Sequence, residues 1–101
     1  MYIAVCDDQQ QEVAALVKLL QQWQRETYTS LRVRTFLSAA EMLDVARNEH
    51  FSLYLLDVMM PGIDGITAAR EIRSFDETAE IVFLTSSPGF AYESYGVHAM
   101  D

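Results

Sequence analysis

The stretch FSLYLLDVMMPGIDG, residues 51–65, decides the fold of this protein. Residues 51–56 form a nearly continuous apolar run, which is typical of a strand buried on both faces of a parallel sheet. The strand is predicted to end at Asp57. Behind it, a loop is marked by Pro61, Gly62 and Gly65. Apolar residues at helical spacing then predict a helix over residues 66–73.

The same pattern repeats on both sides of this stretch. Further strands are predicted at residues 2–6, 31–36 and 81–84, the second of them alternating like an edge strand. A first helix carries an apolar face on Val13, Leu16, Val17, Leu20 and Trp23. A second helix opens with the capping pair Ser38 and Glu41, and a last one is predicted from Ser87 and Pro88. Strands that alternate with helices predict an α/β fold, a doubly wound parallel sheet with helices on both faces.

Length and composition narrow the class of protein. The 101 residues suit one small domain spanning residues 1–101, and with 50% apolar residues the chain can bury a core. The net charge of −8 argues against direct binding of nucleic acid. No apolar run is long enough to span a membrane, and no signal peptide is recognisable. The single cysteine, Cys6, is expected in the core and favours a cytosolic setting.

Acidic residues follow two of the predicted strands at their carboxyl ends. Asp7 and Asp8 come after the first strand, and Asp57 ends the third. If these strands are neighbours, the three carboxylates converge, and Mg²⁺ or Mn²⁺ would offset their repulsion. The hydroxyls of Thr85 and Ser86 follow the fourth strand and would reach the same edge. This set of groups is suited to the transfer of a phosphoryl group onto Asp57.

Simpler roles for these acids stay open at this point. A single Asp at a strand end is most often a helix cap or a turn residue. Asp8 could cap the first helix, with Gln11 reciprocating, and Asp64 before Gly65 is expected to be such a cap. Trp23 is expected to pack in the core or at an interface.

Three motifs together resemble the receiver domain of bacterial two-component response regulators, which has a flavodoxin-like, CheY-like fold. They are VCDD at residues 5–8, LLDVMMPGIDG at residues 55–65 and FLTS at residues 83–86. The stretch FAYESYGVHAMD, residues 90–101, is similar to receivers that precede LytTR-type DNA-binding domains.

The resemblance implies a role for each matching residue. Asp57 would be the phosphoacceptor, phosphorylated by a sensor histidine kinase. The Mg²⁺ ligands would be Asp57, Asp8, Asp7 acting through water, and the backbone carbonyl of Met59. Thr85 and Ser86 would contact the phosphoryl group, with Thr85 as the switch hydroxyl. Met60, Pro61 and Gly65 would shape the loop. Binding to DNA would require an output domain that this sequence does not contain.

The sequence departs from the family pattern at its end. The pattern continues into a fifth strand with an aromatic switch residue and a lysine that pairs with the phosphoryl group, but the chain stops at Asp101. We therefore expect the last strand and helix to be lacking, the fourth strand to be an open edge, and apolar surface to lie beside the first helix. The open edge and the apolar surface predict self-association, and without the lysine phosphorylation is expected to be slow or unproductive.

Two other functions are compatible with the acidic cluster. One is a Mg²⁺-dependent phosphohydrolase with an aspartyl nucleophile, although such enzymes usually carry Asp-x-Asp after the first strand. The other is an interaction module that works without phosphorylation. A receiver would be a signalling module rather than an enzyme that turns over a free substrate.

Overall fold

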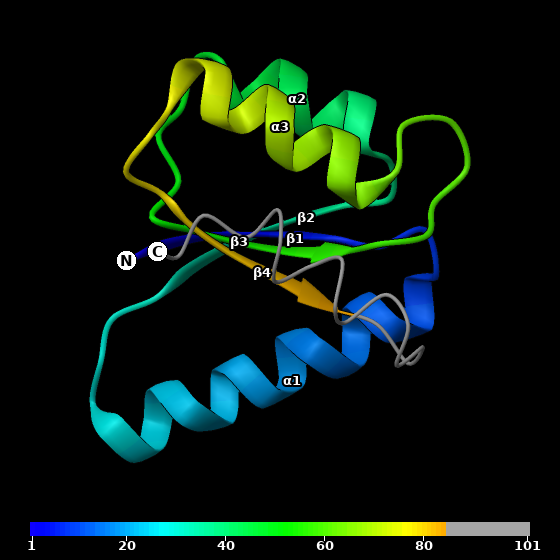
Figure 1. Ribbon diagram of the computed structural model, residues 1–101. Coiled ribbons are helices and arrows are strands. Elements are labelled where there is room, and N and C mark those ends of the chain that lie inside the picture. Colours follow the sequence, from blue (N-terminus) through cyan, green and yellow to red (C-terminus); the bar gives the residue numbers. More distant parts are fainter. Residues whose placement is uncertain (85–101) are drawn as a thin grey trace.

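The computed structural model describes residues 1–84 of the chain. Its elements follow one another in strict alternation (Figure 1). They are β1 (Tyr2–Cys6), α1 (Gln10–Thr27), β2 (Arg32–Phe36), α2 (Ala39–Ala46), β3 (Leu53–Asp57), α3 (Gly65–Phe75) and β4 (Glu80–Leu84). The predicted strands and the first three helices are confirmed to within a few residues. The helix predicted from Ser87 lies outside the described residues.

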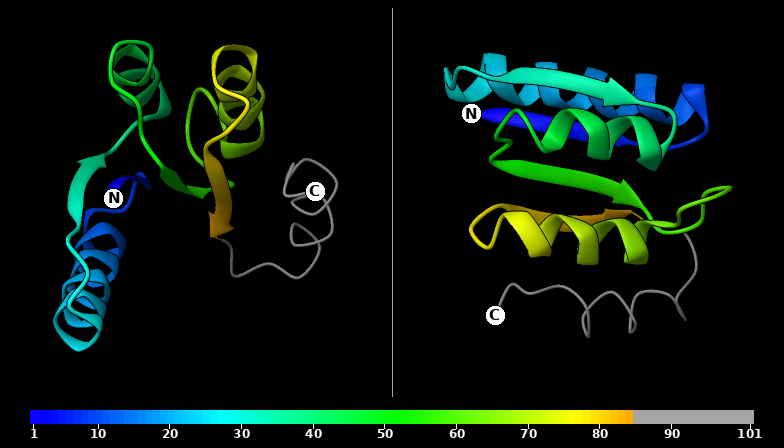
Figure 2. Two further views of the ribbon diagram at one scale, coloured as in Figure 1. Left: turned by 90° about the vertical axis from the view of Figure 1, so that its left-hand side faces the viewer. Right: turned by 90° about the horizontal axis from the view of Figure 1, so that it is seen from above.

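The four strands form one parallel sheet in the order β2-β1-β3-β4. Figures 1 and 2 show α1 on one face of this sheet and α2 with α3 on the other. The predicted doubly wound α/β fold is therefore confirmed. The order makes β1 and β3 neighbours, with Cys6 beside Leu56 in the register. The carboxyl ends of these two strands consequently meet at one edge of the sheet.

The larger part of the core lies between the sheet and the helices α2 and α3. The ring of Phe51 is fully buried and contacts the rings of Tyr2, Phe36 and Tyr54. Met42 from α2 and Ile72 from α3 are equally buried in this cluster. Cys6 belongs to it as well, which confirms its expected place in the core.

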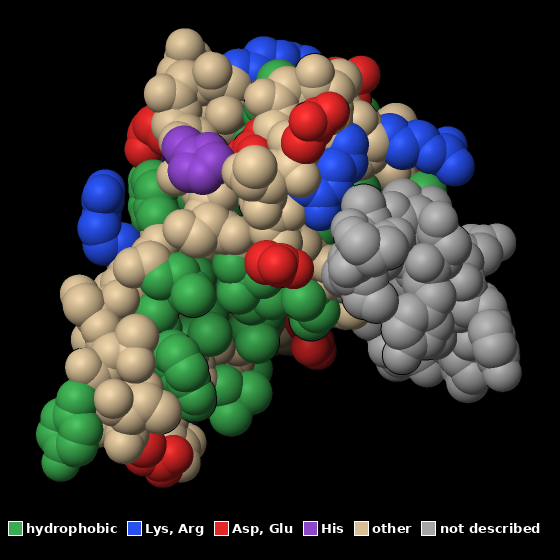
Figure 3. All heavy atoms as spheres, turned by 60° about the vertical axis from the view of Figure 1, so that its left-hand side comes forward, with side chains coloured by type: hydrophobic (Ala, Val, Ile, Leu, Met, Phe, Trp, Pro, Cys, Tyr) green, Lys and Arg blue, Asp and Glu red, His purple; other side chains and the backbone are tan. Residues whose placement is uncertain are grey.

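The α1 side of the sheet is less well covered. Val13 is the buried residue of α1, and in the view of Figure 1 the helix diverges from the sheet toward its carboxyl end. Trp23 is 45% exposed and Leu19 is 63% exposed. Of the two places predicted for Trp23, the core is therefore excluded, and packing at an interface stays a prediction. Val82 in β4 is 41% exposed. Figure 3 shows hydrophobic side chains gathered over this side of the molecule.

Side-chain caps start two of the helices. The hydroxyl oxygen of Ser38 accepts a hydrogen bond from the backbone N–H of Glu41 at 3.2 Å, as the sequence predicts. Asp64 accepts one from the N–H of Thr67 at 2.7 Å, which confirms its expected role as a cap. These bonds satisfy N–H groups that have no partner within the first helical turn.

The Ser38→Ala variant tests how much the cap of α2 contributes. Loss of the hydroxyl leaves the Glu41 N–H without its partner, so the free energy of unfolding is expected to fall by about 1 kcal/mol. Urea denaturation followed by circular dichroism measures this change. The matched control is Ser74→Ala near the end of α3, where the serine hydroxyl donates only to the carbonyl of Glu71. This change should lower the free energy of unfolding by less. Equal effects of the two changes would contradict the assigned role of the cap.

Within residues 1–84, no helix is both long and apolar enough to cross a membrane.

Candidate functional site

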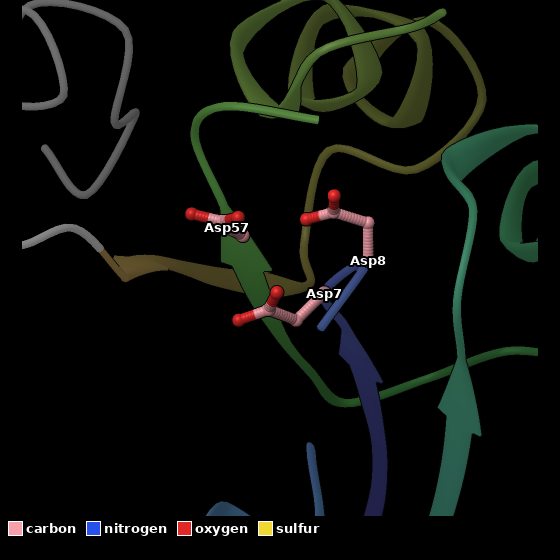
Figure 4. A group of neighbouring side chains, drawn as sticks. All are labelled: Asp7, Asp8 and Asp57. Carbon is pink, nitrogen blue, oxygen red and sulfur yellow. The ribbon is translucent and has the colours of Figure 1, made fainter. Parts of the chain in front are cut away.

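Three carboxylates converge at the edge where β1 and β3 end. Each of Asp7, Asp8 and Asp57 offers an oxygen atom, and these oxygens all lie within 4.8 Å of one another. Figure 4 shows the three side chains grouped at this edge, two from the segment after β1 and one from the end of β3. The predicted convergence of the acids is therefore confirmed. It follows from the pairing of β1 with β3.

The backbone after β1 holds Asp7 and leaves Asp8 available. Asp7 is 8% exposed, and its carboxylate accepts a hydrogen bond from the N–H of Gln9 at 2.9 Å. The helix begins at Gln10 with Gln9 as its N-cap, and no side chain caps it. The simpler reading, in which Asp8 caps α1, is therefore wrong. The sequence does not predict the hydrogen bond from the Gln9 N–H to Asp7, because this bond depends on where the helix starts.

The environment of Asp57 disfavours a negative charge. Burial, the charge of Asp7 and, to a smaller extent, the charge of Asp8 together raise the pKa of Asp57 to about 6. Backbone hydrogen bonds from Met59 and Val58 act in the opposite direction. Burial, together with the same crowding of charge, raises the pKa of the Cys6 thiol to about 12, so this thiol stays protonated. The site therefore holds more negative charge than its own residues can offset.

The loop from β3 to α3 is shaped by glycine. A Cβ atom on Gly65 would overlap the carbonyl oxygen of Asp57 and come within 3.0 Å of the Cα atom of Val58. The N–H of Gly65 donates to the carbonyl of Val58 at 2.9 Å, which closes the loop tightly. The absence of a side chain thus lets α3 begin directly against the backbone of Asp57.

The remaining loop residues differ in exposure. The side chain of Met59 is 63% exposed, whereas Met60 is buried with its sulfur 3.7 Å from the sulfur of Cys6. Gly62 has a φ of 79°, a conformation that glycine adopts easily, and Pro61 precedes it on the surface. This loop and α3 line an open groove of about 660 Å³ beside the site. Thr85 and Ser86 lie outside the described residues.

The donor set fits a hard divalent cation. Three carboxylates offer oxygen ligands from two strands, and like charges this close repel one another unless a cation lies among them. Oxygen ligands that leave open coordination positions suit Mg²⁺ or Mn²⁺. An acidic pocket of this kind can hold a metal ion and present Asp57 beside it.

Comparison with known proteins places the chain in one family. Residues 3–101 match the response regulator receiver domain. The chain is 36% identical to the sensory transduction protein LytT of Oceanobacillus iheyensis over 61 residues, which cover 60% of the chain and 24% of LytT. It is 35% identical to the regulatory protein VanR of Enterococcus faecium over 83 residues, which cover 82% of the chain and 33% of VanR. The matches thus span about a quarter to a third of these relatives.

Solved structures agree with this result. A BeF3-activated DrrB receiver domain superposes with a TM-score of 0.76 at 26% identity, covering 95% of the chain and 76% of that structure. The chemotaxis protein CheY4 of Vibrio cholerae also gives 0.76, at 23% identity, covering 95% of the chain and 78% of that structure. The second likeness supports the fold alone. Similarity to LytT gives the predicted LytTR subfamily only weak support.

Proposed function

The chain belongs to the family of two-component response regulator receiver domains, and we propose that it accepts a phosphoryl group on Asp57 from a sensor histidine kinase. The observation that carries this proposal is the convergence of Asp7, Asp8 and Asp57 within 4.8 Å at the end of two neighbouring strands. Receiver domains are signalling modules. We propose that this one likewise does not turn over a free substrate.

In the proposed reaction, a carboxylate oxygen of Asp57 attacks the phosphorus atom of a phosphohistidine. A P–O bond forms as the P–N bond breaks, and the electron pair stays on the imidazole nitrogen, which takes up a proton. Asp8, Asp7 acting through water and the backbone carbonyl of Met59 would hold Mg²⁺, or Mn²⁺ in its place. The bound cation would offset negative charge on the transferring group.

Other residues would position the reacting groups. The N–H groups of Met59 and Val58 favour the charged form of the Asp57 carboxyl, which is the form that attacks. Gly65 lets α3 begin against the backbone of Asp57. From the family resemblance we assign Pro61 to shaping the same loop. From the family resemblance we also assign Thr85 and Ser86 to contacts with the phosphoryl group, Thr85 being the switch hydroxyl.

The phosphorylated state would control an output in the bacterial cytoplasm. The named relatives LytT and VanR are a sensory transduction protein and a regulatory protein, and both are longer than this chain. We propose that the output is transcription, exerted through a DNA-binding domain outside this sequence. The net charge of −8 is consistent with a domain that does not itself bind DNA.

Intact-mass measurement tests the proposal. The chain is incubated with acetyl phosphate, with and without Mg²⁺, and a gain of one phosphoryl group that requires Mg²⁺ is expected. The control is Asp64→Asn, which keeps the cap of α3 and removes a carboxylate outside the cluster, so it should be phosphorylated like the wild type. A folded chain that gains no phosphoryl group would favour the interaction module. Steady release of phosphate from a phosphate ester would favour the phosphohydrolase.

We also predict self-association through the exposed apolar side chains of Leu19, Trp23 and Val82. Burial of such side chains between copies is favourable, since apolar area removed from water contributes about 25 cal/mol per Å². Size-exclusion chromatography with light scattering should give a mass above that of the monomer, and Trp23→Lys should reduce it. A clean monomer at high concentration would contradict this prediction.

A further inference from the structure

The edge of the sheet formed by β2 is open within the described residues. In the strand order β2-β1-β3-β4, β2 pairs with β1 on one side only. Figure 2 shows β2 at the border of the sheet, with α2 and α3 over one face and α1 over the other. An open edge presents a row of backbone N–H and C=O groups that another extended chain can pair with.

The hydrogen bonds to β1 show which groups of β2 face outward. The N–H of Arg32 donates to the carbonyl of Met1 at 2.9 Å, and the carbonyl of Phe36 accepts from the N–H of Asp7 at 3.2 Å. In a parallel ladder, alternate residues direct both backbone groups to the same neighbour. Residues 32, 34 and 36 therefore bond to β1. The backbone groups of Val33 and Thr35 point away from the sheet.

The two faces beside this edge differ in chemistry. Arg32 and Arg34 lie on the face of α2 and α3, with their guanidinium groups over the rings of Tyr2 at 4.2 Å and Phe36 at 5.8 Å. Val33 and Thr35 lie on the α1 face. They line a groove of about 350 Å³ together with Val17, Gln21, Gln24 and Leu31. A strand added at this edge would thus meet cations on one face and a small groove on the other.

The charge of the β2 side chains indicates which kind of segment can pair with this strand. Arg34 pairs with Glu49 at 2.8 Å, whereas Arg32 has no ion pair within residues 1–84. The edge thus carries local positive charge, although the whole chain carries −8. A second copy is disfavoured, because antiparallel pairing of β2 with β2 would place arginines of the two copies near one another.

We propose that the β2 edge binds an extended segment of a partner protein in which acidic and apolar side chains alternate. The backbone of Val33 and Thr35 supplies the hydrogen bonds to this segment. Its acidic side chains lie next to Arg32 and Arg34, and its apolar side chains enter the groove beside Val17. The edge is remote in sequence from Asp57, and this proposal does not depend on phosphorylation.

A synthetic peptide that alternates glutamate with valine is the probe. It is added to the isotope-labelled full chain, and amide hydrogen exchange is followed by nuclear magnetic resonance. The amides of Val33 and Thr35 should become protected, while those of Arg32 and Arg34, already bonded to β1, should change little. A peptide that alternates lysine with valine should bind at least threefold more weakly, as cross-strand charge pairs predict. Equal binding of the two peptides would overturn the proposal.

Two variants separate binding from folding. Val33→Pro removes an outward N–H without breaking the ladder to β1, a change that an edge strand tolerates, and it should abolish binding. Arg32→Glu, which leaves the pair of Arg34 with Glu49 in place, should weaken binding of the glutamate peptide about threefold. Arg25→Glu on α1 is the matched control and should change little. Unchanged binding in Arg32→Glu, or protection of Val33 on raising the protein concentration without peptide, would overturn the proposal.

Discussion

The Asp57→Asn variant is expected to incorporate no phosphoryl group and, without divalent cations, to be more stable than the wild type. The first result follows because the amide is not a nucleophile that can form the acyl phosphate. The second follows because burial and the neighbouring Asp7 destabilise the Asp57 charge, whose pKa is raised to about 6. Removal of that charge at neutral pH should add about 1 kcal/mol to the free energy of unfolding, after allowance for solvent screening.

The pH dependence of this gain has a definite sign. A carboxyl whose pKa is higher in the folded than in the unfolded state binds its proton more tightly when folded. Its unfavourable effect is absent below the unfolded pKa of 3.8 and grows as the pH rises toward about 6. Above that pH, the difference in free energy of unfolding between the wild type and Asp57→Asn should stay constant. Thermal unfolding of both proteins between pH 4 and pH 8, without divalent cations, measures this difference.

Mg²⁺ should make the wild type more stable than Asp57→Asn, the reverse of the order expected without divalent cations. A cation that binds only the folded chain raises its free energy of unfolding, by about 2.7 kcal/mol at a concentration one hundred times the dissociation constant. Wild type should gain this stability and Asp57→Asn should gain less, because one ligand has lost its charge. Asp64→Asn serves as the control and should follow the wild type. A variant that is less stable than the wild type at pH 8 without Mg²⁺ would refute the assigned electrostatics.

The Gly65→Ala variant is expected to lose about 3 kcal/mol of stability, because a methyl group has no room at the start of α3. Its Cβ atom would overlap the carbonyl oxygen of Asp57, so the backbone of β3 or of α3 must move. The same movement displaces the Asp57 carboxylate from Asp7 and Asp8. Phosphorylation by acetyl phosphate and the stability gained from Mg²⁺ should therefore fall as well.

Gly62→Ala provides the matched control in the same loop. Gly62 has a positive φ of 79° but no atom within 4 Å of its Cβ position. Alanine there costs only the left-handed conformation, roughly 1 kcal/mol, and leaves Asp57 in place. Urea denaturation compares the two variants. A Gly65→Ala variant as stable as Gly62→Ala would show that α3 can shift freely. The close approach of Gly65 to the backbone of Asp57 would then contribute nothing to stability.

Much of this protein was determined by its sequence alone, because the deciding signals are local. The apolar run before Asp57, Gly65 behind the loop, and the caps Ser38 and Asp64 depend on hydrophobic periodicity and backbone preferences over a few residues. They predicted the strands, the first three helices and the parallel sheet. Since parallel strands end at a common edge, they also placed Asp7 and Asp8 at the same edge of the sheet as Asp57.

Tertiary structure alone decided the rest, because it brings together residues that are distant in sequence. The pairing of β1 with β3 sets the 4.8 Å grouping of the carboxylates and the raised pKa of Asp57. The start of α1 at Gln10 resolved whether Asp8 is a cap, which spacing could not do. The exposure of Trp23 depends on how α1 lies against the sheet, whereas periodicity shows only which side of a helix is apolar.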